Sequence, residues 1–150
     1  VLGANVEQLV LTGTAAVNGT GNTLANRLIG NSAANVLSGG IGTDTLIGGA
    51  GTDTLNGGAG NDVLTGGGDA DFFIFAVGGD RDRITDFQDN VDTLRIDDGL
   101  FGPGAATWAG LAAVGQAFAD RVEFHFAPTQ VLTVYGVTQV AQLADDYAFI

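Results

Sequence analysis

The sequence predicts an all-β protein built from very short strands and tight glycine turns. A nine-residue pattern of glycine, aspartate or asparagine, and a large apolar residue recurs without a break over residues 21–74. Glycine supplies 25 of the 150 residues, against a usual share of about 7%, and the chain has only 2 prolines, so a collagen-type repeat is excluded. Every acidic residue except Glu7 and Glu123 is aspartate, the acid that favours turns.

The clearest part of the pattern is four consecutive units over residues 39–74. They read GGIGTDTLI, GGAGTDTLN, GGAGNDVLT and GGGDADFFI. In each unit an aspartate precedes a large apolar residue by two positions: Asp44 and Leu46, Asp53 and Leu55, Asp62 and Leu64, Asp71 and Phe73. Two softer units, GNTLANRLI (21–29) and GNSAANVLS (30–38), keep the register but carry Asn26 and Asn35 at the aspartate position. A fixed period of this kind indicates stacked structural repeats.

This GGxGxDxUx unit resembles the calcium-binding nonapeptide repeat of the RTX (repeats-in-toxin) family. The resemblance implies a right-handed parallel β-roll, in which each unit forms a glycine loop and a short strand, and two units complete a coil. Units i and i+2 then lie one strand spacing apart, about 4.8 Å. The two edges of the roll would stack these residues: Asn26, Asp44 and Asp62 on one edge, and Asn35, Asp53 and Asp71 on the other.

The stacked aspartates predict bound Ca²⁺. Two carboxylates about 5 Å apart repel by roughly 0.8 kcal/mol in water, and by about 3 kcal/mol at an effective dielectric constant near 20. Ca²⁺ between the loops removes this repulsion, because it takes about six to eight oxygen ligands from carboxylates and backbone carbonyls. Folding is then coupled to ion binding. We expect several ions, with the best-supported sites between Asp44 and Asp62 and between Asp53 and Asp71.

Loop glycines are the other expected ligands, because glycine allows positive φ angles and lets backbone carbonyls approach an ion. The glycines expected at the sites are Gly40, Gly42, Gly49, Gly51, Gly58 and Gly60. Asn26 and Asn35 bring no charge, so we expect the sites that they would share with Asp44 and Asp53 to be weaker or empty. Asp69 stands where the pattern has glycine, and it either adds a ligand or relaxes the last loop.

Both flanks are expected to cover the roll. Residues 1–20 predict one or two strands at the N-terminal end of the roll of residues 21–74, and residues 75–150 predict a β-rich C-terminal cap with one short helix. GPG at 102–104 predicts a break in the cap. Within residues 105–119, the helical spacing of Trp108, Leu111 and Phe118 predicts the helix. RVEFHF and QVLTVY predict a hairpin.

The start of the cap carries further acids. DRITDF and DTLRI alternate like half-buried strands and resemble a cap segment typical of the family. Two interpretations of its acids stay open. The acids Asp80, Asp82, Asp86 and Asp92 complete an additional Ca²⁺ site, or they are solvated turn residues paired with Arg81, Arg83 or Arg95 of the same segment.

The last residues resemble a C-terminal signal for type I secretion. An acidic pair, Asp145 and Asp146, precedes the apolar ending YAFI. The alternative is that these residues form a final buried strand. Both interpretations hold, at different times, if the export machinery reads the signal before the chain folds. The resemblance implies a bacterial protein that is exported to the extracellular space by the type I machinery. We expect the chain to be a fragment of a larger protein.

Composition excludes several classes of function. Seventeen acidic residues against five basic ones, a formal net charge of −12, leave no basic face for nucleic acid. Without cysteine there is neither a disulfide nor a thiolate metal site. No apolar run reaches the roughly 18–20 residues of a transmembrane segment. The single histidine, His125, falls in the alternating run RVEFHF and is expected on a strand surface.

These features predict a Ca²⁺-binding module that folds outside the cell and supports type I secretion of a larger protein. We expect no enzyme in this chain, and any catalytic domain would lie outside it. The alternative function is Ca²⁺-dependent binding of carbohydrate or of a cell surface, within a secreted enzyme, an adhesin or a surface-layer protein. Exposed polar side chains such as Thr45, Thr54 and Asn56 would serve that function, and an anionic polysaccharide would need Ca²⁺ or arginine as a bridge.

Overall fold

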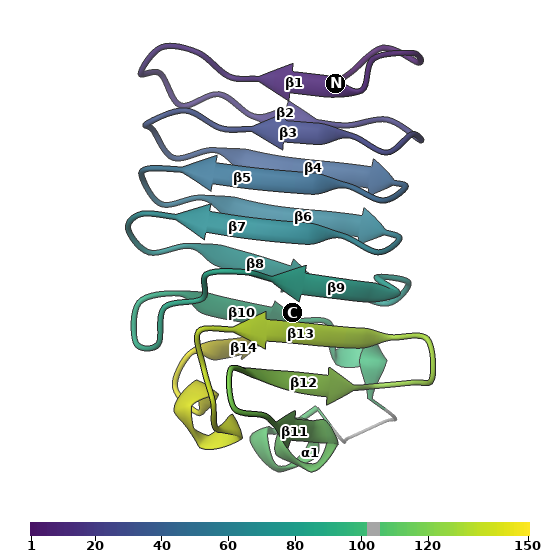
Figure 1. Ribbon diagram of the computed structural model, residues 1–150, viewed down its shortest axis with the longest axis vertical. Coiled ribbons are helices and arrows are strands. Elements are labelled where there is room, and N and C mark those ends of the chain that lie inside the picture. The colour runs from purple at the N-terminus through teal and green to yellow at the C-terminus, as the bar shows by residue number, and fades with distance from the viewer. Residues whose placement is uncertain (102–105) are drawn as a thin grey trace.

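The computed structural model describes residues 1–101 and 106–150. Two sheets face each other, and within the repeats the chain passes from one sheet to the other at every glycine loop (Figure 1). The first sheet has the strand order β1-β3-β5-β7-β9-β13-β12-β11 and the second β14-β10-β8-β6-β4-β2. Every neighbouring pair is parallel except β13 with β12 and β12 with β11. The predicted parallel β-roll is therefore confirmed.

The strands of the roll are short because each repeat has room for only a few residues between loops. Those of the first sheet are β1 (Gln8–Val10), β3 (Arg27–Ile29), β5 (Thr45–Gly49), β7 (Val63–Gly67) and β9 (Arg81–Ile84). Those of the second sheet are β2 (Gly19–Thr20), β4 (Val36–Ile41), β6 (Thr54–Ala59), β8 (Phe72–Phe75), β10 (Thr93–Ile96) and β14 (Tyr147–Phe149).

A single column of apolar residues from each sheet fills the interior. Successive side chains of a strand point to opposite faces, so most of these strands turn one large residue inward. β8 and β10 turn two inward, Phe73 with Phe75 and Leu94 with Ile96. The parallel registers place these residues directly over one another, and each of them is buried: Leu28, Leu46, Leu64 and Ile84 in one sheet, and Leu37, Leu55, Phe73 and Leu94 in the other. The core is consequently continuous but only two side chains thick.

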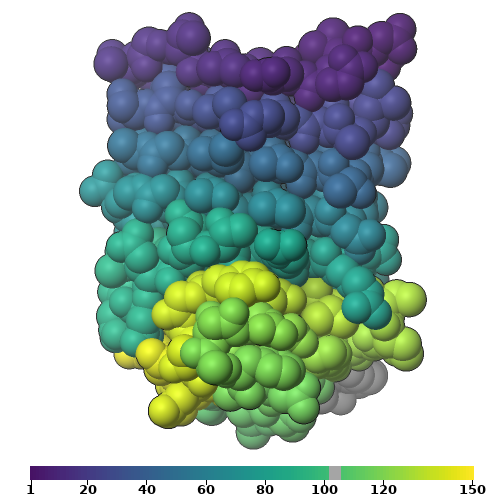
Figure 2. All heavy atoms as spheres, in the orientation of Figure 1, coloured from purple at the N-terminus to yellow at the C-terminus, as the bar shows by residue number. Residues whose placement is uncertain are grey.

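The cap closes the C-terminal end of the roll, where it covers the last coil in Figure 2. Its elements are the 3₁₀ helix Asp98–Leu100, α1 (Trp108–Val114), β11 (Gly115–Ala117), β12 (Arg121–His125), β13 (Val131–Tyr135) and the 3₁₀ helix Val140–Leu143. Aromatic contacts hold this end together: Phe101 meets Phe126 at 5.4 Å and Phe149 at 5.6 Å between ring centroids. No helix among the described residues is long and apolar enough to cross a bilayer.

The helix prediction was right in kind but too long. Thr107 caps α1 by accepting the N–H of Gly110 at 3.1 Å, and the helix ends at Val114. From Gly115 the chain is extended, because β11 pairs antiparallel with β12, so Phe118 does not lie on the helix. The predicted hairpin is present as β12 and β13. The predicted break at 102–104 lies outside the described residues.

Parallel pairing crosses both expected boundaries of the roll. β1 and β2 precede residue 21 and pair with β3 and β4, while β9 and β10 follow residue 74 and pair with β7 and β8. The division into residues 1–20, 21–74 and 75–150 stays a prediction.

Candidate metal sites in the loop columns

The structure stacks the predicted residues of the first edge into one column. The backbone N–H of Asn26 donates to Asp44 Oδ1 at 2.7 Å, and that of Asp44 donates to Asp62 Oδ1 at 2.7 Å. The N–H of Asp62 donates in turn to Asp82 Oδ1 at 3.0 Å. Each carboxylate thus uses one oxygen to fix the loop of the preceding coil.

The second edge repeats the arrangement. The N–H of Asn35 donates to Asp53 Oδ1 at 2.7 Å, that of Asp53 to Asp71 Oδ1 at 2.8 Å, and that of Asp71 to Asp92 Oδ1 at 2.9 Å. All the aspartates of both columns are buried. Two rows of acidic side chains therefore run inside the loops of a protein that already carries a formal net charge of −12.

The second oxygen of four column aspartates is buried without any hydrogen-bond partner. These atoms are the Oδ2 atoms of Asp44, Asp53, Asp62 and Asp71. Leaving a buried polar group unsatisfied costs about 1–3 kcal/mol, and more if it is charged. A row of such atoms at the same position of all four aspartate repeats points to a ligand that satisfies them.

The first glycine of each repeat makes room for these oxygens. A Cβ on Gly39 would collide with Asp44 Oδ2 in its own loop and with the carbonyl oxygen of Gly57 in the next loop. Gly48 stands in the same relation to Asp53 Oδ2 and Gly66 O. Oxygen atoms from two consecutive loops thus converge on a space that only glycine leaves free.

Six other loop glycines take the left-handed backbone that the sequence predicted. Their φ angles are 109° at Gly40, 128° at Gly42, 119° at Gly49, 91° at Gly51, 100° at Gly58 and 132° at Gly60. The donor set around each loop is therefore carboxylate and carbonyl oxygen, without nitrogen or sulfur side chains. This set fits Ca²⁺, which takes oxygen ligands in flexible geometry.

Burial dominates the acid–base behaviour of the columns. Burial raises the pKa of Asp62 to about 6, with a smaller contribution from the charges of Asp44 and Asp80, while the hydrogen bond from the Asp44 backbone lowers it. Burial likewise raises the pKa of Asp71 to about 7 and that of Asp82 to about 8. A bound cation would compete with protons at these carboxylates, because Ca²⁺ ligands must be deprotonated.

Asp69 has a structural partner. It takes the left-handed conformation of the glycine that it replaces, with φ of 72°, and its Oδ2 accepts the N–H of Gly51 at 3.0 Å. It thereby links the loop of its own repeat to the loop of the preceding coil. A role as Ca²⁺ ligand stays a prediction.

The cap acids fall into two groups. Asp82 and Asp92 continue the two columns, and Asp92 also accepts the N–H of Gln88 on its Oδ2 at 2.9 Å, so both its oxygens have backbone partners. Asp86 accepts the N–H groups of Gly66 and Gly67, each at 2.9 Å. Asp86 therefore covers the last glycine loop instead of lying in a column.

The alternative of arginine pairing is wrong among the described residues. None of the three arginines forms an ion pair with these acids in the described part of the chain, and in β9 alternation turns Arg81 and Arg83 outward while Asp82 points inward. Arg81 donates to Pro128 O at 3.1 Å. Arg83 lies 5.7 Å from the ring centre of Tyr135, and Arg95 lies 3.8 Å from that of Phe72.

A third group of acids was not recognised as a cluster in the sequence. Carboxylate oxygens of Asp89, Asp145 and Asp146 lie within 4.8 Å of one another, and Asp146 accepts the N–H of Asn90 at 2.9 Å. They meet because β14 pairs in parallel with β10. The sequence feature that could have predicted this pairing is the similarity between DTLRI and the ending DDYAF. Each places large side chains two and four positions after its first aspartate.

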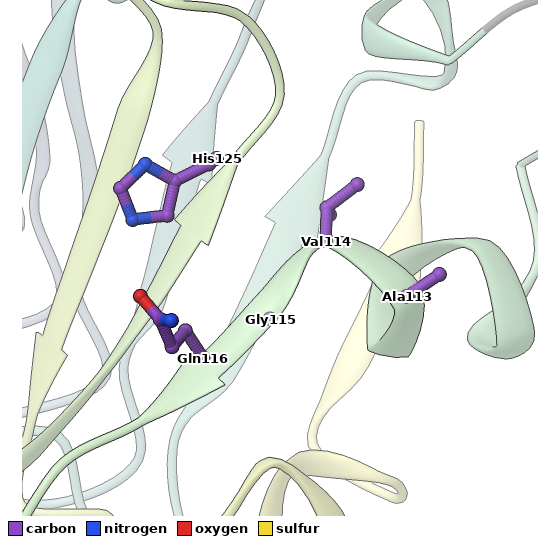
Figure 3. A pocket seen from close by; sticks show the side chains of 5 residues that line it. All are labelled: Ala113, Val114, Gly115, Gln116 and His125. Atoms are coloured by element: carbon purple, nitrogen blue, oxygen red, sulfur yellow. The ribbon is translucent and has the colours of Figure 1, made fainter.

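A surface pocket of about 420 Å³ lies beside the helix of the cap (Figure 3). It is lined by Ala113, Val114, Gly115, Gln116 and His125, so His125 is its only titratable side chain. His125 is exposed on β12, as predicted, with Nε2 3.4 Å from an oxygen of Glu123. This lining does not pair an acid with a base.

Comparison with known proteins agrees with the geometry. The model of the RTX calcium-binding nonapeptide repeat (4 copies) matches residues 20–55 and 47–82. The fold is similar to the solution structure of the AlgE6R3 subunit from the Azotobacter vinelandii mannuronan C5-epimerase, with a TM-score of 0.56 and 29% identity over 92% of this chain and 81% of that one. No curated protein matches the chain. Residues 20–82 therefore match the RTX calcium-binding nonapeptide repeat, and they fold as a parallel β-roll.

Proposed function

We propose that this module folds when it binds Ca²⁺ outside the cell and thereby supports type I secretion of a larger protein. The observation that carries the proposal is the row of buried, unpartnered Oδ2 atoms on both columns. A thin core offsets little of the cost of ordering a glycine-rich chain, and glycine loses more backbone entropy on folding than any other residue. Ion binding then supplies the missing free energy.

The ions would lie between consecutive loops of one edge. Asp44 with Asp62, and Asp53 with Asp71, offer facing carboxylates, and the loop glycines add carbonyl oxygens. Asp82 extends the first of these columns, and its pKa is raised chiefly by burial. Bound Ca²⁺ supplies charge neutralisation and cross-linking, while the chain supplies the oxygen ligands.

Export requires a chain that is unfolded inside the cell. Where free Ca²⁺ is low, the columns repel and the roll stays open, so the C-terminal residues are accessible to the export machinery. In the folded state the same residues form β14, parallel to β10. The signal would therefore be read before folding and lost into the sheet afterwards.

Far-UV circular dichroism during a Ca²⁺ titration tests the folding step, after removal of metal with chelator and with Mg²⁺ as control. We expect a cooperative change from coil to β-structure with Ca²⁺ alone. A chain that is already fully folded in chelator would contradict the proposal. Replacing residues 145–150 with polar residues should abolish export of a fusion protein while leaving Ca²⁺ binding by the separate loops of residues 39–71 intact.

A second candidate function is Ca²⁺-dependent binding of carbohydrate or of a cell surface. It is favoured by the similarity to a subunit of an enzyme named for a polysaccharide, mannuronan. Thr45, Thr54 and Asn56 lie half-buried on the outer faces of the two sheets, where an extended chain can contact them. Binding to a glycan array in saturating Ca²⁺, lost in chelator and unaffected by exchange of residues 145–150, would distinguish this function from secretion.

A further inference from the structure

We infer that the coil of the first two repeats, residues 21–38, binds no ion, because side-chain amides take the place that the cation has in the later loops. The inference rests on the proposed function in one respect only, the assignment of Ca²⁺ to the aspartate loops. It concerns Asn22, Asn26, Asn31 and Asn35, which occupy equivalent positions in the first two repeats.

On the first edge, amide nitrogens reach carbonyl oxygens of the preceding chain. Asn22 Nδ2 donates to Gly3 O at 2.7 Å and to Val6 O at 2.8 Å, and Asn26 Nδ2 donates to Val6 O at 3.2 Å. These bonds join consecutive loops, which is what an ion between two loops would do. They add no charge next to the carboxylate of Asp44.

The second edge shows the same kind of hydrogen bond from a side-chain amide to a backbone carbonyl. Asn31 Nδ2 donates to Ala15 O at 2.9 Å, and Asn35 Nδ2 donates to Val17 O at 2.7 Å. Two edges with different flanking sequences thus reach one arrangement. The recurrence indicates a property of the asparagine repeat rather than of one loop.

The asparagine side chains also leave no oxygen without a partner. Asn26 Oδ1 accepts the N–H of Asn22 at 2.7 Å, and Asn35 Oδ1 accepts the N–H of Asn31 at 2.9 Å. The equivalent Oδ2 atoms of Asp44 and Asp53 are buried and unpartnered. Buried oxygen atoms that require a cation therefore first occur in the third repeat, at Asp44.

The backbone of these loops differs as well. None of residues 21–35 has a positive φ angle, whereas Gly40 and Gly42 have φ angles of 109° and 128° at the corresponding loop positions. Asn22 Oδ1 instead accepts the N–H of Leu24 at 2.8 Å, which closes the loop as an Asx turn. Changing the amide to a carboxylate would consequently not create the carbonyl arrangement of an aspartate loop.

Asn35→Asp tests the inference, with Asp53→Asn as the matched opposite change one coil further on. The number of Ca²⁺ ions bound per chain is measured by equilibrium dialysis, and amide hydrogen exchange of residues 14–20 is followed by mass spectrometry. We expect Asn35→Asp to bind as many ions as the wild-type chain but to exchange at least about tenfold faster at residues 14–20. Asp53→Asn should bind fewer ions, with unchanged exchange at residues 14–20.

Asn35→Ala removes the amide without adding a carboxylate and should bind as many ions as the wild-type chain. Loss of an ion in that variant, or unchanged exchange at residues 14–20 in Asn35→Asp, would overturn the inference. Should that variant fail to fold, Asn31→Ala removes the bond to Ala15 O without adding charge, and the same two measurements apply with the same expectations. Failure of the proposed function is separate, because it would appear as a wild-type chain that binds no Ca²⁺ at all.

Discussion

Replacing Asp62 by asparagine should change stability in opposite directions with and without Ca²⁺. Asp62 lies between Asp44 and Asp82 in its column, accepts one backbone N–H through Oδ1, and leaves Oδ2 buried without a partner. Asparagine keeps the acceptor and removes the charge. In chelator the substitution relieves repulsion, whereas in Ca²⁺ it removes a ligand.

The size of each effect follows from the geometry. Carboxylates one strand spacing apart, about 4.8 Å, repel by about 0.9 kcal/mol in water and about 3.5 kcal/mol at a dielectric constant near 20. Burial raises the pKa of Asp82 to about 8, so the charges that repel Asp62 at neutral pH are chiefly those of Asp44 and Asp80. The metal-free folded state should gain about 1–3 kcal/mol. In Ca²⁺ at a thousandfold excess over Kd, each ion lost costs about 4 kcal/mol.

Two equilibrium measurements separate these effects. The midpoint of folding induced by trimethylamine N-oxide is measured in chelator by circular dichroism, and urea unfolding is measured in saturating Ca²⁺. Asp62→Asn should fold at lower osmolyte concentration in chelator and unfold at lower urea concentration in Ca²⁺. Asp98→Asn, an equal charge change at an exposed residue outside the columns, is the control. Equal destabilisation of Asp62→Asn under both conditions would refute the electrostatic argument.

Three further predictions concern the core, the loops and pH. Leu46→Ala should lower the free energy of unfolding in Ca²⁺ by about 2–5 kcal/mol, measured by urea unfolding. Ile41→Ala, at a residue 59% exposed, should lower it by less than about 0.5 kcal/mol. Similar losses in the two variants would contradict the assignment of Leu46 to the core. Gly58→Ala should lower Tm far more than Gly78→Ala. Both glycines have a positive φ angle, but a Cβ would collide with a neighbouring atom only at Gly58, where it would meet the carbonyl oxygen of Gly40. Equal shifts in Tm would exclude this collision. In chelator the folded fraction should rise as the pH falls from about 8 to about 5, because the folded state binds more protons through aspartates such as Asp82, whose pKa is raised to about 8. In saturating Ca²⁺ the trend should reverse, since the ligands must be deprotonated, and a rise on acidification there would argue against carboxylate ligation.

The strict period made the central coils predictable. A unit of nine residues with two units per coil brings residues 18 positions apart together, and the bond from Asp44 to Asp62 has this separation. The same argument placed Leu46 over Leu64 in the interior. Local chemistry was sufficient here, because each loop needs the same left-handed glycines and each strand has one inward position.

The ends of the columns were not predictable in this way. The bond from Asp62 to Asp82 spans 20 residues, and that from Asp71 to Asp92 spans 21. Added loop residues break the period, although the strands still stack. Sequence spacing alone therefore left the role of the cap acids open, and the orientation of the arginines depended on which strand face met the core.

The distribution of unpartnered atoms indicates where the roll depends on metal. In the first coil, side-chain amides bond to carbonyl oxygens, as Asn35 does with Val17 at 2.7 Å. At the other end, buried residues of the cap such as Phe124 and Leu132 extend the core beyond the last coil. The buried oxygens without partners in the repeats all belong to the coils between these ends. Since the strands there contribute only one or two large side chains each to the interior, removal of Ca²⁺ should open the middle coils first and leave the cap hairpin the most protected from hydrogen exchange.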